Sequence, residues 1–136
     1  MKADSFSIKS SSSDRELVFS RVRENHFTVE LVGTEFRAIR EVYTFTDHHG
    51  LPKLFCWLAA QQRPWSGNQG WGSLEGEFSF SATCSQLGEV LLLVSIWGLP
   101  GAPEEWRVSG SVTTELGQLP KIAEGVSRLF GVEVDT

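Results

Sequence analysis

Alternating hydrophobic and polar positions predict β-strands in both halves of the chain. Apolar side chains at every second position place one face of a strand against a core and leave the other face in water. The alternation is cleanest where Phe78, Phe80 and Ala82 are separated by polar residues. In full, the pattern predicts six strands, at residues 16–23, 26–32, 35–45, 75–84, 89–97 and 105–115.

A second period, of about 3.6 residues, predicts two helices. Residues 51–62 carry apolar side chains at the spacing of one helix face, and Pro52 suits the first turn. The helix near the C-terminus is predicted more strongly, because its apolar residues fall within an arc of about 120° and Gly131 is a natural stop. The apolar residues of this second helix are Leu119, Ile122, Ala123, Val126, Leu129 and Phe130.

The predicted order is three strands followed by one helix, and it occurs twice. Both helices open with Leu-Pro-Lys, at Leu51 and Leu119, half the length of the 136-residue chain apart. A match this short fits either an ancient duplication or chance. The economical architecture is α+β, an antiparallel sheet of about six strands with two helices packed on one face. We expect residues 16–136 to form this single domain and the serine-rich residues 1–15 to be a flexible leader.

The charge and hydropathy of the chain narrow the class of partner. A net charge of −5 argues against nucleic acid, which needs clustered Lys and Arg, and suits a basic protein. The first residues lack the apolar run of a secretory signal, and the longest apolar block, 90–94, is too short to span a bilayer. We therefore expect a cytoplasmic protein without a membrane partner. Cys56 and Cys84 then fit small buried hydrophobes better than a disulfide.

Groups that could carry chemistry do not converge in the sequence. A zinc site needs three or four ligands, whereas the Asp-His-His turn at residues 47–49 offers neighbouring side chains that diverge. Cys56 has no predicted base or oxyanion site. The carboxylates of Glu75 and Glu77 are more typical of a solvated strand end than of a glycosidase. We expect no catalytic residue, no metal and no cofactor, and therefore not an enzyme.

The loop at residues 63–74 is the predicted place for a partner. The rings of Trp65 and Trp71 either fold back as core or form an exposed anchor, since aromatic residues are enriched at binding hot spots. Nearby carboxylates would pair with Lys or Arg of a basic partner. The candidate partner-binding residues are Trp65, Asn68, Trp71, Glu75 and Glu77.

The strand predicted at residues 89–97 is apolar on both faces, which is typical of a central strand with cover on each side. If the helices cover one face, then Leu91, Leu93 and Trp97 need another cover. The N-terminal arm, the tryptophan loop, a second copy or a partner could provide it. The oligomeric state is accordingly a monomer or a homodimer through the open sheet face.

Several short spacings carry a family resemblance. They are Leu54-Phe55-x-x-Leu58, Trp65-x-Gly67, Trp71-x-Ser73-x-Glu75-Gly76 and Gly88-x-Val90. With these spacings the chain resembles a family of small, uncharacterised bacterial domains. That family is similar to the immunity proteins that protect bacteria from wall-associated and other polymorphic toxins. The resemblance covers residues 26–130 and implies an α+β fold, no catalytic residues and a toxin-neutralising role. The 47–49 turn and the serine-rich leader lie outside the matching pattern.

Two functional hypotheses follow from these observations. The first is an immunity-type binding protein that neutralises a cognate bacterial toxin domain by stoichiometric binding. The second is a small-molecule binding module with an apolar pocket between the sheet and the helices, lined by aromatic side chains.

Overall fold

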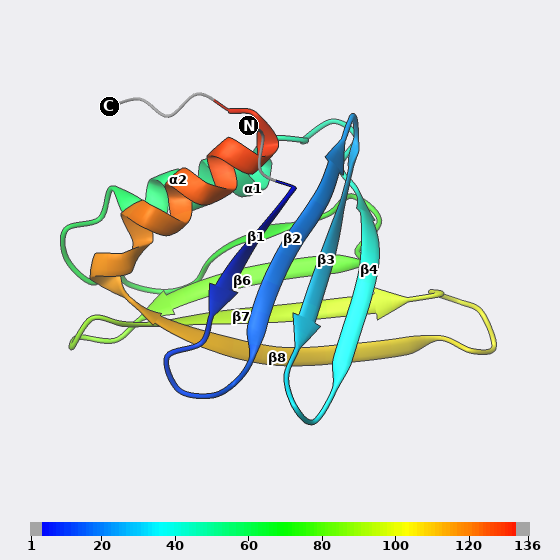
Figure 1. The fold of residues 1–136 in the computed structure, drawn as a ribbon, viewed down its shortest axis with the longest axis horizontal. Coiled ribbons are helices and arrows are strands. Elements are labelled where there is room, and N and C mark those ends of the chain that lie inside the picture. The colour runs from blue at the N-terminus through cyan, green and yellow to red at the C-terminus, as the bar shows by residue number, and fades with distance from the viewer. Residues whose placement is uncertain (1–3, 133–136) are drawn as a thin grey trace.

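Two four-stranded antiparallel sheets and two helices make up the computed structural model, which describes residues 4–132 (Figure 1). Within each sheet, the strands lie in the order in which they occur in the chain. Sheet A contains β1 (Ser5–Lys9), β2 (Glu16–Arg23), β3 (His26–Val32) and β4 (Arg37–Tyr43), and α1 (Gly50–Ala59) follows it. Sheet B contains β5 (Gln69–Gly72), β6 (Phe78–Cys84), β7 (Glu89–Gly98) and β8 (Trp106–Glu115), followed by a short 3₁₀ turn (Leu116–Gln118) and α2 (Leu119–Phe130).

The α+β class is confirmed, but the single six-stranded sheet is wrong, because the strands form two separate sheets. Two of these strands fall in segments expected to be irregular. Strand β1 lies in the predicted leader and pairs with β2, from Ser5 opposite Ser20 to Lys9 opposite Glu16. Strand β5 lies in the predicted tryptophan loop and pairs with β6. Residues 1–3 of the leader lie outside the described residues.

The two sheets and the helices share one core. Figure 1 shows the strands of sheet A crossing in front of those of sheet B, with both helices together at one side. Phe19 of sheet A lies edge-on to Phe55 of α1 and Phe78 of sheet B, with ring centroids 6.3 and 6.4 Å apart. All three rings are fully buried. Aromatic side chains therefore pack where the two sheets and α1 meet.

The helices form where the sequence predicted them. Helix α2 buries the whole apolar stripe from Leu119 to Phe130 and ends at Gly131, whose φ of 72° is easily adopted by glycine. Helix α1 is three residues shorter at its end than the predicted range. Neither helix of the described chain, residues 4–132, is long and apolar enough to cross a membrane.

Four strands followed by a helix occur twice in the described chain. The repeated tripeptide lies in the first turn of both helices, because Leu51-Pro52-Lys53 follows the first residue of α1 and Leu119-Pro120-Lys121 begins α2. The repeat in the sequence therefore coincides with a repeat in the order of elements.

Candidate protein-binding site

Both tryptophans of the predicted site pack against, and hydrogen-bond to, other residues of the same chain. Trp65 is buried, and its indole N–H donates a hydrogen bond to the carbonyl oxygen of Ala82 (3.2 Å). Trp71 is half-buried, and its indole N–H donates to Asp47 Oδ2 (2.9 Å). The Trp71 ring also packs against Phe27 and Phe78 of the core. Their burial favours the core interpretation over the exposed anchor, most clearly for Trp65.

The three polar residues of the predicted site are divided between two places. Asn68 is exposed just before β5, whereas Glu75 is exposed in the turn between β5 and β6. Glu77 comes directly before β6 and is buried. The structure therefore brings Glu75 and Glu77 together without Asn68 or the tryptophans.

The two glutamates border a surface hollow at the free edge of β4, with a volume of about 270 Å³. We call it the β4-edge hollow. Its lining combines sheet A with the turn before β6, and the lining residues are His26, Arg40, Glu41, Tyr43, Glu75 and Glu77.

Glu77 is the unusual group of this hollow, because its side chain is only 3% exposed. Its carboxylate accepts hydrogen bonds from the backbone N–H of Tyr43 (3.3 Å) and from the hydroxyl of Ser73. Within residues 4–132, no Lys, Arg or His nitrogen lies within 4.0 Å of this carboxylate. A buried carboxylate usually has a cationic partner, and this one keeps acceptor capacity that its two donors do not fill.

The other charges of the hollow leave it acidic. Arg40 is directed to backbone carbonyls, donating from Nε to Trp97 (3.3 Å) and from Nη1 to Glu41 (3.1 Å). The Glu41 carboxylate forms an ion pair with Arg23. The lining residues therefore include three carboxylates and one guanidinium, and of the carboxylates only that of Glu41 is in an ion pair within the described chain.

Aromatic rings flank the acidic groups. Tyr43 stacks on Phe45 with ring centroids 5.9 Å apart and planes at 8°, and its other neighbour is His26 at 5.1 Å. Phe45 is exposed and Tyr43 is half-buried. Sequence reasoning placed these rings in a strand but not in a site. The available signal was the alternation of Tyr43 and Phe45 at a strand end next to charged residues.

His48 and Cys56, which the sequence offered as candidate reactive groups, both contact neighbouring elements of the fold. His48 Nδ1 hydrogen-bonds the Thr44 hydroxyl (2.5 Å), and the ring packs on Phe130 of α2. Burial lowers the pKa of His48 below its usual value, and the neighbouring His49 lowers it further. Cys56 Sγ lies 3.5 Å from Ser127 Oγ, between the two helices. Among residues 4–132, no three His, Cys, Asp or Glu side chains are grouped so that they could hold a metal ion.

Comparison with known proteins places the chain in a family but assigns it no activity. The family model described as "Family of unknown function (DUF6228)" matches residues 8–133, nearly the whole sequence. No curated protein matches the chain. The family description names no toxin, so the likeness to immunity proteins is still a hypothesis drawn from the sequence. By the extent of the match, this chain belongs to the family of unknown function DUF6228.

Proposed function

We propose that this protein is an immunity-type binding protein that neutralises a cognate bacterial toxin domain by stoichiometric binding. The β4-edge hollow is the contact site in this proposal, and it receives a Lys or Arg side chain of the toxin. The observation that carries the proposal is the buried Glu77 carboxylate, which has two hydrogen-bond donors but no cationic partner in the described chain.

A partner cation would complete the hydrogen bonding of the hollow. An entering ammonium or guanidinium meets Glu77 at the base and the exposed Glu75 at the rim. Hydrogen bonds between ionised groups are shorter and stronger than neutral ones, and they strengthen further when the partner excludes water. The Tyr43 ring offers a face on which the stem or the cation can pack.

The surface around the hollow suits protein recognition. Tyrosine and arginine are enriched among the residues that dominate interface energetics, and both occur here beside exposed aromatic surface. The net charge of −5 also favours a basic partner, because long-range attraction raises the association rate. We therefore expect the association rate to fall as salt concentration rises.

The test begins with the proteins encoded beside this one, expressed singly in a bacterial host to find any that arrest growth. Co-expression of this protein should restore growth, and light scattering on the purified pair should give a complex of fixed stoichiometry. Failure to restore growth with every such toxin would contradict the proposed function.

Two substitutions test the hollow itself. Glu75→Lys reverses an exposed charge at the rim and should weaken toxin binding about tenfold or more. Tyr43→Ala should cost about 2 kcal/mol of binding free energy. Glu35→Lys is the matched control, because it makes the same charge change at an exposed residue in the β3–β4 turn, at the other end of β4. Equal effects of Glu75→Lys and Glu35→Lys would place the contact elsewhere.

A further inference from the structure

The outer face of sheet B, which points away from the core, carries uncovered apolar side chains at its centre. Leu91 and Leu93 of β7 remain 41% and 43% exposed. Strand β7 is a central strand, paired with β6 on one side and β8 on the other. The N-terminal segment reaches the edge of this sheet, where the hydroxyls of Ser10, Ser11 and Ser12 hydrogen-bond Thr113 of β8, but the two leucines remain exposed. The tryptophan loop does not cover them either, since β5 pairs with β6.

Small hydroxyl residues border the two leucines on both neighbouring strands. Leu93 stands between Ser81 of β6 and Ser111 of β8 in the pairing register. The next outward position of β7 is Ser95, which lies between Ser79 and Ser109. The centre of this face is therefore a short apolar ridge next to a row of small side chains, which can accept a ridge of similar size.

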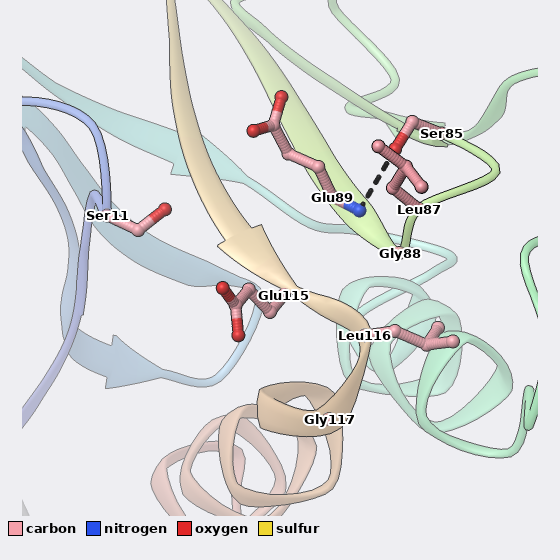
Figure 2. Close-up of a pocket in the computed structure, with 8 residues that line it drawn as sticks. All are labelled: Ser11, Ser85, Leu87, Gly88, Glu89, Glu115, Leu116 and Gly117. Carbon is pink, nitrogen blue, oxygen red and sulfur yellow. Dashed lines mark hydrogen bonds between the residues drawn. The ribbon is translucent and has the colours of Figure 1, made fainter.

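The two ends of the same face carry different charged groups. At one end, Glu89 of β7 is paired with Glu115 of β8, and both are exposed beside a hollow of about 700 Å³ (Figure 2). At the other end, Trp97 is paired with Arg107, whose guanidinium lies 4.1 Å from the Trp97 ring centroid. Arg107 is exposed, and the Glu105 carboxylate lies near the same two side chains.

We infer that the outer face of sheet B binds a second copy of this chain in an isologous dimer. The two-fold axis lies between the two sheets, perpendicular to their strands, and passes over Leu93. In this arrangement, β8 of one copy lies over β8 of the other copy, and the two strands run in opposite directions. Arg107 of each copy then lies over Glu115 of the other, so the dimer contains two equivalent ion pairs.

The same axis also matches the apolar and small residues. The two copies of Leu93 meet at the axis, and Leu91 of one copy lies over Ser95 of the other. Glu89 lies over Trp97, so the acidic end meets the end that carries the stacked Trp97–Arg107 pair. The alternative axis, parallel to the strands and also over Leu93, would place β8 of one copy over β6 of the other, so both Arg107–Glu115 pairs would be lost, and Glu89 would lie over Glu89.

The size of the face indicates a weak dimer. The four strands contain 4, 7, 10 and 10 residues, which at a spacing of about 4.8 Å and a rise of about 3.3 Å per residue give a buried area of roughly 500 Å² per copy. The total of roughly 1,000 Å² is in the range of weak, transient interfaces, so we expect the dimer to dissociate on dilution. The net charge of −5 on each copy opposes association beyond the local contacts and is screened by salt.

Sedimentation equilibrium of the purified full chain, between about 1 µM and 1 mM, tests the inference. A dimer should form at the high end of this range. Leu93→Lys should raise the dissociation constant about tenfold or more, because it places two ammonium groups at the axis. Ile39→Lys is the matched control. Its side chain is 45% exposed on a strand of sheet A, and this substitution should leave the dissociation constant unchanged.

Exchanging the charges of Arg107 and Glu115 tests whether these two residues face each other across the dimer. Arg107→Glu alone should weaken association about tenfold, and Arg107→Glu combined with Glu115→Arg should restore it, because each reversed charge meets a reversed partner. Circular dichroism identifies any variant that fails to fold. A wild-type monomer at every concentration would overturn the inference, and so would a double variant as weak as the single one. A dimer that is insensitive to Leu93→Lys would overturn it equally.

Discussion

Gly125 in α2 provides a sensitive test of how β1 docks on the helices. A Cβ atom at this position would overlap the ring of Phe6, with Cζ only 2.6 Å away and two other ring carbons closer still. Phe6 belongs to β1 and is half-buried against the core. Gly125→Ala therefore forces the Phe6 ring away from α2, and β1 must either lose this contact or shift along the helix.

Two opposing effects determine how much Gly125→Ala changes the free energy of unfolding. Alanine in place of glycine in a helix interior stabilises by about 1 kcal/mol. Full burial of a phenylalanine is worth about 1.5–3 kcal/mol, so expelling a half-buried ring loses roughly 1–2 kcal/mol and also exposes part of α2. We expect Gly125→Ala to lower the free energy of unfolding by about 1 kcal/mol. In a Phe6→Ala background the overlap is absent, so the same substitution should raise stability by about 1 kcal/mol.

Urea denaturation followed by tryptophan fluorescence measures all four members of this double-mutant cycle. Gly117→Ala is the control, because no atom outside the immediate chain lies within 4 Å of a Cβ at that site. A change of sign between the two backgrounds would confirm that Phe6 lies on α2. If Gly125→Ala stabilised the native sequence, the reasoning would be refuted, because that result would mean that β1 does not pack on α2.

Three further predictions concern other parts of the fold. Trp65→Ala should lower the free energy of unfolding by about 3–5 kcal/mol, because the ring is buried and its N–H is bonded to Ala82; urea denaturation would measure the loss. Gly98→Ala should destabilise the β7–β8 hairpin, since a Cβ there would occupy the Trp106 ring, and thermal unfolding should show a lower midpoint than Gly117→Ala. Because burial lowers the pKa of His48, the unfolded chain binds more protons, so stability should fall as pH drops below about 6.5. In His48→Gln, the difference in stability between pH 5 and pH 8 should be smaller, and an unchanged difference would contradict this assignment.

Much of the fold could be predicted because the alternation and the helical period are local properties. Helix α2 and the β6–β7 hairpin are long enough for their patterns to be unambiguous. Strand β1 has only one fully buried side chain, Ile8, among polar neighbours, and β5 is a four-residue strand with two glycines. Alternation also shows that a strand has a buried face without showing what covers it. The six predicted strands could form one sheet covered by two helices, or two sheets that pack on each other. The sequence pattern is the same in both cases.

The candidate site was only partly predictable for a related reason. Sequence reasoning selected Glu75 and Glu77, which border the hollow, and treated them as equivalent positions on a strand. Strand β6 begins only at Phe78, so Glu75 lies in the preceding turn. The side chain of Glu77, by contrast, is directed to β4, where its carboxylate accepts a hydrogen bond from the Tyr43 N–H. That contact joins residues 34 positions apart in the chain, and no local pattern encodes it.

The sequential order of strands in each sheet has a consequence for how this chain could be divided. No strand of one half pairs with a strand of the other in the described chain, so the halves are joined by side-chain packing and by single hydrogen bonds, such as that from the Ser11 N–H to the Thr113 carbonyl oxygen. A cut in the loop between α1 and β5 would leave every strand ladder intact and would separate two fragments that each expose an apolar face. Such fragments should reassociate by burying that surface. The fold therefore offers a natural division point for a fragment-complementation reporter, in which recovery of tryptophan fluorescence signals that the two halves have met.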